Sequence, residues 1–520
     1  MSKRALLSVY SKEGIVKFAR DLIRLGYEII SSGGTAKALK EVGLSVIEIS
    51  DLTGYPAMLG HRVATLHPAV HGGILARRIP EDEADLIKYK INRIDLVCVD
   101  LYPVKKCTDD SNRTILEMLD LTDIGGPTLI RGAAKNSPHG VTVICDPKDR
   151  PFVIDELEKH GHVREIVRAY LAIKVFATMA GYDGAIAKRF ADEYGVPFFF
   201  LSSDEAVEVR YGTNPHQKEA RVFFDNSGPL RKGQWEIPYE GKPLSYTNWE
   251  EILYTADLVS RFHQAKPTAV VFKHESPCGV ASYPDARLAF QRAWNGDPIA
   301  AFGSTIGVNF AVTEALAETM ARNFFEVLVC PSLDPAALAV FKKERRNLRI
   351  LTTKAVLGPY VGRYRESKAK MGVILEQERD FYIPAPGDFI QVSERPVTER
   401  QLSDLVFAAI CCQAIFSNAT VICRDRTMIG YGRHGSSRVD TCEWAVAKVR
   451  QFERGFRSSV AVTDGFFPFP DGLEVLAKAG VKAIACPSAP TPGLKSGEVI
   501  KAADKLGVAL LHLNHRLFRH

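Results

Sequence analysis

The stretch Y-E-I-I-S-S-G-G-T, residues 27–35, contains the pattern that decides our interpretation of the fold. Residues 27–30 form a short, mostly apolar run of the length of a buried strand, and the serines and glycines that follow mark a turn. This turn opens a further helix. A strand that passes through a glycine turn into a helix is the repeating unit of α/β folds.

The same alternation continues on both sides of this stretch. Strands are expected at residues 5–10, 46–49, 96–101 and 141–145, and helices at residues 15–25 and 163–194. Such alternation predicts a mostly parallel sheet with helices on both faces. We expect a first domain at residues 1–200 and a second α/β domain at residues 201–520, which a proline-rich, charged passage divides into two lobes near residues 380–395.

Composition narrows the class of protein. A chain of 520 residues is too long for one core, and its 46% hydrophobic and 25% charged residues are typical of globular proteins. No apolar run approaches the roughly 18 residues of a membrane helix, and the first residues lack the pattern of a cleavable signal. Ten scattered cysteines without a C-x-x-C pair argue against a disulfide framework and predict a reducing compartment. These features predict a cytoplasmic protein without a membrane partner. The net charge of +6 is mild and no Lys/Arg block is interleaved with aromatic residues, so we expect no nucleic-acid partner.

The stretch V-V-F-K-H-E-S-P-C-G, residues 270–279, contains the first candidate for chemistry. Residues 269–272 predict a buried strand, and Ser276, Pro277 and Gly279 predict a loop beyond it. Lys273 and His274 would then lie together at a strand end. An imidazole can accept a proton near neutral pH, and an ammonium can stabilise developing negative charge. The alternative is a solvated pair at a strand terminus.

A second candidate lies in the first domain. The serine, glycines and threonine of residues 32–35 predict a phosphate cradle, because glycines let the backbone approach an anion and a helix N-terminus offers free N–H groups. A helix cap uses the same letters and remains the alternative. Further polar and glycine residues follow in R-V-A-T-L-H-P (62–68), D-L-Y-P (100–103) and D-I-G-G-P-T-L-I-R-G-A-A-K-N (123–136). Together they predict a site.

The ordered set of these motifs resembles the bifunctional purine biosynthesis family, which joins an IMP cyclohydrolase to a 5-aminoimidazole-4-carboxamide ribonucleotide (AICAR) formyltransferase. The second half of the chain agrees through R-Y-G-T-N-P-H-Q (210–217), L-S-Y-T-N (244–248), A-A-F-G (300–303), S-N-A (417–419), S-R-V-D (437–440) and N-H-R-L-F-R-H (514–520). The resemblance covers essentially the whole chain. It implies an N-terminal methylglyoxal-synthase-like parallel-sheet domain, followed by a two-lobed, cytidine-deaminase-like α/β formyltransferase domain.

The resemblance also implies two successive reactions of de novo purine biosynthesis. A formyl group passes from 10-formyltetrahydrofolate, a co-substrate, to AICAR, and the formylated nucleotide then loses water and closes to IMP. No metal is required. The partners are the small-molecule nucleotide and folate substrates and a second copy of the chain in a homodimer.

The family motifs assign roles to residues of this chain. The formyl transfer would use Lys273, His274 and Asn418, and the ring closure Tyr102, Asp123 and Lys135. Substrate binding in the first domain would involve Lys12, Ser32, Gly34, Thr35, Arg62 and Thr65. Substrate binding in the second domain would involve Arg210, Tyr211, Gly303, Glu326, Arg438, Phe466, Asp471 and Arg516.

Three features keep alternatives open. Ala64 stands where the family has a lysine, so the alternative is a formyltransferase whose first domain is impaired or only binds a nucleotide. Arg433 and His434 are bulkier than the family's residues in this loop, through drift or through a changed folate side. His274 with Pro277-Cys278 also matches part of the zinc deaminase signature P-C-x-x-C, but Ala281 replaces its second cysteine and no zinc is expected. A non-catalytic nucleotide sensor is disfavoured, because a binding protein needs no proton acceptor.

Overall fold

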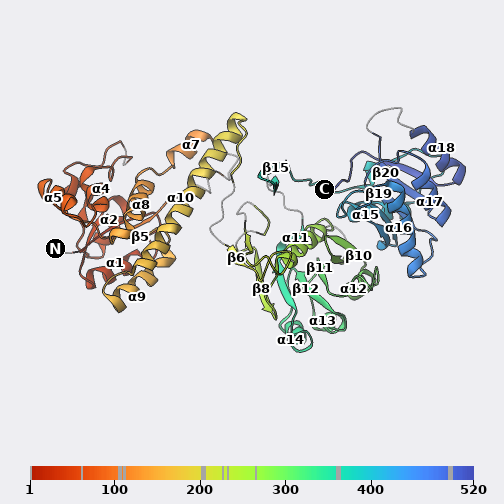
Figure 1. The fold of residues 1–520 in the computed structure, drawn as a ribbon, viewed down its shortest axis with the longest axis horizontal. Helices are drawn as coiled ribbons and strands as arrows, with labels where there is room; N and C mark the ends of the chain where they lie inside the picture. The colour runs from red at the N-terminus through yellow and green to blue at the C-terminus, as the bar shows by residue number, and fades with distance from the viewer. Residues whose placement is uncertain are drawn as a thin grey trace. The chain divides into compact units, whose positions relative to one another are not determined.

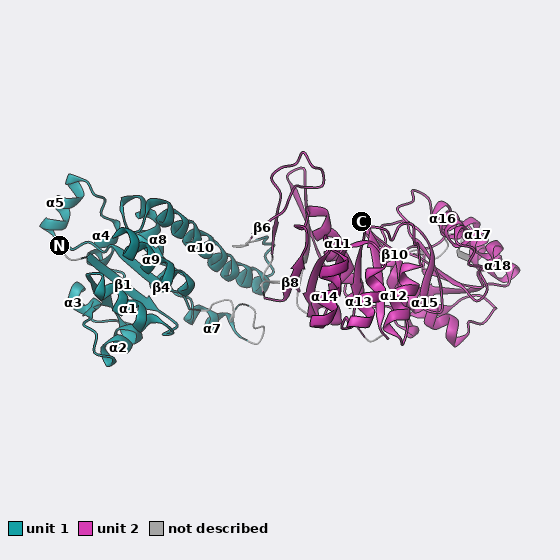
Figure 2. Cartoon of the chain, turned by 90° about the horizontal axis from the view of Figure 1, so that it is seen from below, with its two compact units in different colours: residues 1–205 teal, residues 206–520 magenta. Residues whose placement is uncertain are grey.

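The computed structural model describes residues 3–59, 62–102, 108, 113–200, 206–224, 228–230, 233–263, 266–358, 365–489 and 496–520. The chain forms two compact units, Met1–Glu205 and Ala206–His520, which Figure 2 shows in different colours. Residues 201–205, which follow the predicted end of the first domain, and Pro103 lie outside the described residues. Within the described ranges, no helix is long and apolar enough to cross a membrane.

Unit 1 is built on a five-stranded sheet in the order β3-β2-β1-β4-β5, and each neighbouring pair of strands is parallel. The strands are β1 (Lys3–Val9), β2 (Tyr27–Ser31), β3 (Ile47–Glu48), β4 (Leu96–Asp100) and β5 (Thr142–Ile144). The predicted parallel α/β arrangement is confirmed. Polar residues that follow β1, β2 and β4 lie at one edge of the sheet, because the carboxyl ends of parallel strands meet there.

The helices of unit 1 are α1 (Ile15–Arg24), α2 (Gly33–Glu41), α3 (Ile49–Thr53), α4 (Pro68–Leu75), α5 (Pro80–Lys88), α7 (Ile115–Asp120), α8 (Gly125–Lys135), α9 (Arg150–His160) and α10 (Glu165–Tyr194). Most of them pack around this sheet, whereas α5 and α7 lie away from it (Figure 1). In α1, Ile15, Phe18 and Leu22 are buried at helical spacing and join the core of the unit. This one-sided burial is what places such a helix against a sheet.

Unit 2 contains a twelve-stranded sheet in the order β16-β21-β20-β19-β17-β18-β10-β9-β11-β12-β13-β8, counted over the described residues. One half comprises β8 (Trp235–Glu240), β9 (Thr268–Lys273), β10 (Ser276–Ser282), β11 (Ser304–Val308), β12 (Phe325–Cys330) and β13 (Arg349–Thr353). The other half comprises β16 (Phe389–Gln391), β17 (Thr420–Arg424), β18 (Thr427–Gly432), β19 (Val460–Thr463), β20 (Ala483–Pro487) and β21 (Ala509–Leu513). The two halves meet where β10 pairs with β18.

Helices flank this sheet, and two small hairpins lie outside it. The helices are α11 (Tyr246–Ser260), α12 (Ala286–Trp294), α13 (Glu314–Ala321), α14 (Pro335–Glu344), α15 (Glu399–Cys412), α16 (Arg438–Gln451), α17 (Asp471–Ala479) and α18 (Ser496–Leu506). The hairpins are β6 (Ala206–Glu208) with β7 (Arg221–Phe223), and β14 (Arg365–Lys370) with β15 (Val373–Glu378).

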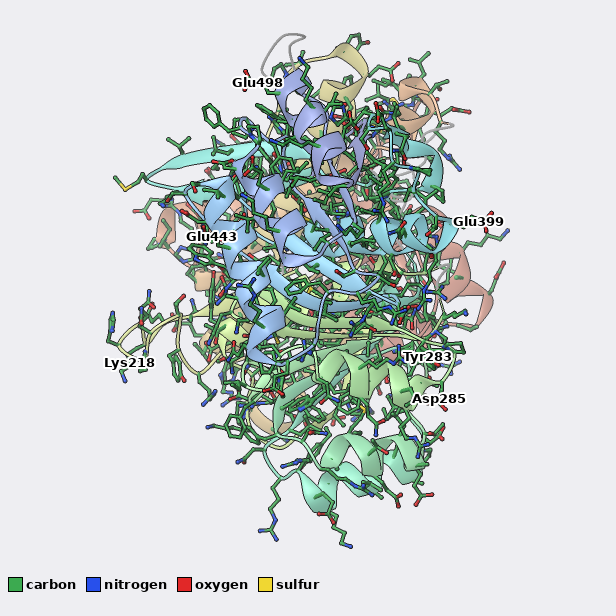
Figure 3. All side chains as sticks on the ribbon, turned by 90° about the vertical axis from the view of Figure 1, so that its right-hand side faces the viewer. Lys218, Tyr283, Asp285, Glu399, Glu443 and Glu498 are labelled. Carbon is green, nitrogen blue, oxygen red and sulfur yellow. The ribbon has the colours of Figure 1, made fainter. Side chains whose placement is uncertain are left out.

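Acidic residues mark where several of these helices begin. Asp285 caps α12 by accepting a hydrogen bond from the Leu288 N–H at 2.8 Å. Glu399 and Glu498 occupy the first turns of α15 and α18. Figure 3 shows all three side chains at the surface. A negative charge at these positions satisfies free N–H groups or complements the helix dipole, so the local sequence fixes where each helix starts.

Candidate active sites

Lys273 and His274 lie at a tight hairpin that joins β9 to β10, at one end of these two central strands of the unit 2 sheet. β9 ends at Lys273 and pairs antiparallel with β10, which starts at Ser276, so His274 and Glu275 are the two turn residues. Both have positive φ, +49° and +63°. The predicted loop at Ser276, Pro277 and Gly279 is therefore wrong. These residues belong to β10, where a register shift between Pro277 and Gly279 accommodates the proline.

Glu251 of α11 holds this turn in place. Its Oε1 accepts a hydrogen bond from the His274 backbone N–H at 3.1 Å, and its Oε2 accepts one from the Thr305 hydroxyl at 2.8 Å. Burial raises the pKa of the Glu251 carboxyl, although these hydrogen bonds and the nearby Lys273 and His274 oppose the shift. A residue other than glycine costs on the order of 1–3 kcal/mol in this backbone region. The sequence analysis missed Glu251.

The ammonium of Lys273 points toward the start of β11. Its Nζ donates to the carbonyl oxygens of Phe302 and Gly303 at 3.0 and 2.7 Å. Gly303 has a φ of +71°, and a Cβ there would lie 3.1 Å from Nζ. The predicted residues Lys273 and Gly303 are thus brought together. The glycine leaves room for the ammonium beside the backbone.

A cavity of about 200 Å³ adjoins the hairpin. It is lined by Lys273, His274, Cys278, Ile299, Ala300, Phe302, Tyr431 and Arg433. The Arg433 guanidinium donates to the His274 carbonyl at 3.2 Å, so this departure from the family pattern lies in the site itself. Burial raises the pKa of the Cys278 thiol to about 12. Cys278 is therefore a neutral wall residue and no nucleophile near neutral pH.

Asn418 belongs to a second, buried cluster at the same edge of the sheet. Its Oδ1 accepts from the Arg438 guanidinium at 2.5 Å, and its Nδ2 donates to the Gly435 carbonyl at 2.9 Å. Arg438 in turn forms an ion pair with Asp464, which is fully buried and also accepts from the Ala419 N–H at 2.9 Å. The sequence analysis predicted Asn418 and Arg438 but missed Asp464.

Strand register places this cluster beside the hairpin. Thr420 of β17 lies opposite both Gly432 of β18 and Thr463 of β19, so Asn418, Arg433 and Asp464 all project from one edge. The sheet order places β17 two strands from β10, where the His274 turn ends. At this end of the strands, Arg433, which follows β18, connects the two positions through its hydrogen bond to the His274 carbonyl.

The chain's C-terminal segment is held at the Asn418 cluster. The Leu517 N–H donates to the Asp464 carbonyl at 3.0 Å, and the neighbouring Arg516 guanidinium lies 4.4 Å from the Phe518 ring centre. Phe466 lies two residues after Asp464, beyond the end of β19, and Asp471 begins α17. Asp464 therefore joins Arg438 to the C-terminal segment that contains Arg516.

The remaining predicted residues of unit 2 gather near the starts of β12 and β13. Glu326 Oε2 accepts from Asn248 and from Arg349, each at 3.4 Å. Burial lowers the pKa of Arg349, and the carboxylate of Glu326 opposes this shift. Arg210 lies 5.2 Å from the Tyr211 ring, and its buried Nε has no hydrogen-bond partner among the described residues.

The cradle of unit 1 lies at the carboxyl edge of its sheet. Lys12 Nζ donates to Thr35 Oγ1 at 3.2 Å, and a Cβ at Gly34 would lie 3.6 Å from the Lys12 Cε. Burial lowers the pKa of Lys12. Thr35 hydrogen-bonds to the backbone of Val9, and Ser32 precedes α2 without a side-chain capping bond. The side-chain cap that we considered as the alternative is absent from this described segment.

Asp123 and Thr65 meet at the start of α8. Asp123 Oδ1 accepts from the Gly126 N–H at 2.9 Å, and burial raises the pKa of its carboxyl. A Cβ at Gly125 would lie 2.9 Å from Thr65 Oγ1, so the threonine hydroxyl lies against the same turn. Tyr102 follows β4, and its ring contacts that of Tyr10 at 5.2 Å.

Arg62 lies at the exposed surface of this segment, and Lys135 lies at the far end of α8. Arg62 is exposed and forms an ion pair with Asp120. Lys135 is the last residue of α8, whereas Asp123 lies just before its first turn. At 1.5 Å per residue the helix separates its two ends by roughly 15 Å. The structure does not bring Lys135 to Asp123, because they are at opposite ends of one helix.

Ala64 lines a second cavity, of about 230 Å³. Its walls are Thr53, Tyr55, Pro56, Met58, Val63, Ala64, Leu66 and His67. The rings of Tyr55 and His67 lie 5.7 Å apart, and Met58 pairs with Val63 in an antiparallel bridge. The space beside Ala64 is therefore open where a longer side chain would extend.

The fold is that of a two-unit α/β protein with one group of candidate site residues in each unit. Residues 133–448 match the model of the family described as "AICARFT/IMPCHase bienzyme", and residues 14–128 match the MGS-like domain. The bifunctional purine biosynthesis protein PurH of Acidithiobacillus ferrooxidans is 40% identical and covers 99% of each chain. PurH of a Thermoanaerobacter species is 37% identical over the whole of both chains. A crystal structure of ForH, with a TM-score of 0.33, is 37% identical and covers 36% of this chain and all of its own.

The chain belongs to the AICARFT/IMPCHase bienzyme family. It is a bifunctional enzyme of purine biosynthesis, with an N-terminal MGS-like domain of parallel-sheet type and a larger α/β domain. The family uses a folate co-substrate. The predicted family, fold class and pair of activities are confirmed, and the comparisons give no support to a formyltransferase alone.

Proposed function

We propose that unit 2 transfers a formyl group from 10-formyltetrahydrofolate to the 5-amino group of AICAR, and that unit 1 closes the product to IMP. The observation that carries this assignment is the Lys273–His274 pair at the rim of the 200 Å³ cavity. The substrates are small molecules and the active form is a homodimer in the cytoplasm. No metal takes part in either step.

In the transfer step, the AICAR amine attacks the formyl carbon of the folate. The imidazole of His274 accepts the amine proton, because the amine becomes acidic as its nitrogen forms the new bond. The ammonium of Lys273 stabilises the negative charge that develops on the formyl oxygen and supplies a proton to the departing folate nitrogen. Asn418, fixed by Arg438, orients the substrate.

In the closure step, the carboxamide nitrogen of the formylated nucleotide attacks the formyl carbon, and water leaves. Lys12 and the backbone of the Ser32–Thr35 turn hold the phosphate, and Arg62 and Thr65 contribute to binding. Asp123 moves the proton, because burial raises the pKa of its carboxyl toward the range in which an acid can exchange protons. Tyr102 provides a hydrogen bond at the exposed side. Lys135 is left out of this step, since it lies at the far end of α8.

Replacing Glu251 tests how the hairpin is held. In Glu251→Gln the His274 N–H loses a charged acceptor, and we expect the kcat of formyl transfer to fall roughly ten- to hundredfold, because small misplacements of reacting groups have effects of this size. The KM for AICAR should stay nearly constant. Glu250→Gln, in the neighbouring position on α11, is the matched control. Equal kcat values in the two variants would refute the positioning role.

Introducing the family's lysine tests the cavity at Ala64. In Ala64→Lys we expect IMP formation from supplied formylated nucleotide to accelerate at least tenfold, because one placed donor at a developing oxyanion typically changes a rate by 10²–10³. Formyl transfer should not change. Leu59→Lys, which adds the same charge on the exposed face of this segment, should leave closure unaltered. An unaccelerated Ala64→Lys would show that the cavity has no part in closure.

A further inference from the structure

Asp297 is a fully buried residue in the connection between α12 and β11. Its Oδ1 accepts a hydrogen bond from the Ala300 N–H at 3.0 Å. Its Oδ2 accepts one from the Tyr431 hydroxyl at 3.1 Å and forms an ion pair with the Lys448 ammonium at 2.6 Å. Burying an acidic group is costly unless it is paired and hydrogen-bonded, and here both oxygens have partners. Neither step of the proposed chemistry uses this group.

Two of these partners are walls of the cavity of about 200 Å³ beside the hairpin. Ala300 and Tyr431 both line it, and they come from opposite halves of the unit 2 sheet, because Ala300 precedes β11 and Tyr431 belongs to β18. Burial and the nearby Asp297 carboxylate raise the pKa of the Tyr431 phenol, so the hydroxyl keeps its proton and donates it to Asp297. Asp297 therefore ties two walls of the cavity together.

The backbone turn that Asp297 anchors also holds the ammonium of Lys273. At one end of the turn, the Ala301 N–H donates to the Asp297 carbonyl at 2.9 Å. At its other end, the carbonyls of Phe302 and Gly303 accept from Lys273 Nζ. Ala301 and Phe302 are adjacent in the chain, so a displacement at Asp297 passes to the ammonium through the backbone alone.

We propose that Asp297 is a positioning residue for formyl transfer, which fixes the turn of residues 298–303 and, through it, the ammonium of Lys273. The inference rests on the proposed function of the Lys273–His274 pair. An ammonium that stabilises a developing oxyanion must lie where the charge appears. Misplacement by about 1 Å can reduce a rate roughly a hundredfold, so a residue that acts only on the turn still controls the rate.

Replacing the carboxylate by an amide is the first test. Asp297→Asn keeps the size of the side chain and an acceptor for the Ala300 N–H, but it removes the charge that pairs with Lys448. We expect the kcat of formyl transfer to fall about ten- to hundredfold. The KM for AICAR should stay within about twofold of the wild type, because the ammonium acts on the transition state more than on the bound nucleotide.

Asp404→Asn is the matched control. Asp404 is also buried, and its carboxylate accepts from the Asp425 and Arg426 N–H groups at 2.9 and 2.7 Å. These two residues form the turn between β17 and β18, at the opposite end of β18 from the cavity. The control variant loses a comparable buried carboxylate, so its stability should fall while its kcat stays at the wild-type value.

A double change separates positioning of the ammonium from a general loss of structure. Asp297→Asn is combined with Lys273→Met, and the residual transfer rate is measured at high enzyme concentration. Once the ammonium is gone, Asp297 has nothing left to position, so the double variant should transfer within about threefold of the rate of Lys273→Met. Should Asp297→Asn fail to fold, Asp297→Asn with Lys448→Met leaves no unbalanced charge and enters the same comparison.

Two results would overturn the inference. One is a wild-type kcat in Asp297→Asn, and the other is a loss by the same factor with and without Lys273. The chemistry itself is decided separately by His274→Ala. If that variant transfers the formyl group normally, the proposed function fails. A normal Asp297→Asn beside an inactive His274→Ala refutes only the positioning role.

Discussion

His274→Ala, supplied with AICAR and 10-formyltetrahydrofolate, should release tetrahydrofolate roughly 10²–10⁴-fold more slowly than the wild type. This is the usual contribution of a placed general base. The imidazole belongs to a two-residue turn whose backbone is held by Glu251, so its removal takes away the proton acceptor without disturbing a buried element. The rate is followed by the absorbance change as the formyl folate is consumed.

The matched comparison is His139→Ala, which removes an exposed histidine of unit 1. This variant should transfer the formyl group at the wild-type rate. Added imidazole should restore part of the activity of His274→Ala, because the lost group is a base. Near-normal turnover without imidazole would mean that another residue accepts the proton, and our reading of the hairpin would be wrong.

Asp464→Ala should lower the free energy of unfolding of unit 2 by about 3–5 kcal/mol. Removing one partner of a buried ion pair leaves the other charge without compensation, and losses of this size are typical. Arg438 is 9% exposed, and its guanidinium would lose the carboxylate while remaining buried. Formyl transfer should also be lost, because Asn418 depends on Arg438 for its position.

The experiment is favourable because all four tryptophans, Trp235, Trp249, Trp294 and Trp444, belong to unit 2. Urea unfolding followed by tryptophan fluorescence therefore reports on this unit alone. Glu474→Ala removes an exposed partner of Lys478 and should cost less than about 1 kcal/mol. The double change Asp464→Ala with Arg438→Met should recover stability but not activity. A wild-type transition in Asp464→Ala would show that the ion pair does not support the site.

Much of the fold follows from local patterns. The strand at residues 27–30 and the helix at residues 15–25 were predictable, because apolar residues recur there with strand or helix spacing. The start of β10 was not, because proline and glycine usually mark loops. Pairing of Ser276 and Pro277 with Lys273 and Phe272 overrides that local preference, and such pairing is invisible in a single sequence.

The site residues also include predictable and unpredictable ones. Lys273, His274 and Asn418 were predictable from motifs, whereas Asp464 was not, because its role arises from contacts with Arg438 and with the backbone of Ala419, which is 45 residues away in the chain. Glu251 left a usable signal: it lies one helical turn from Asn248 and Thr255, both on the buried face of α11. A carboxylate on such a face indicates a buried partner. Lys135 shows the converse limit, since a motif gives the order of residues but not the end of the helix at which each one lies.

The most direct test of this account assays the two half-reactions separately in His274→Ala. We predict that the variant no longer releases tetrahydrofolate when it is given AICAR and the formyl folate. It should still form IMP from supplied formylated nucleotide at a rate within twofold of the wild type. If ring closure fell together with formyl transfer, or if transfer survived, the assignment of one reaction to each unit would be contradicted.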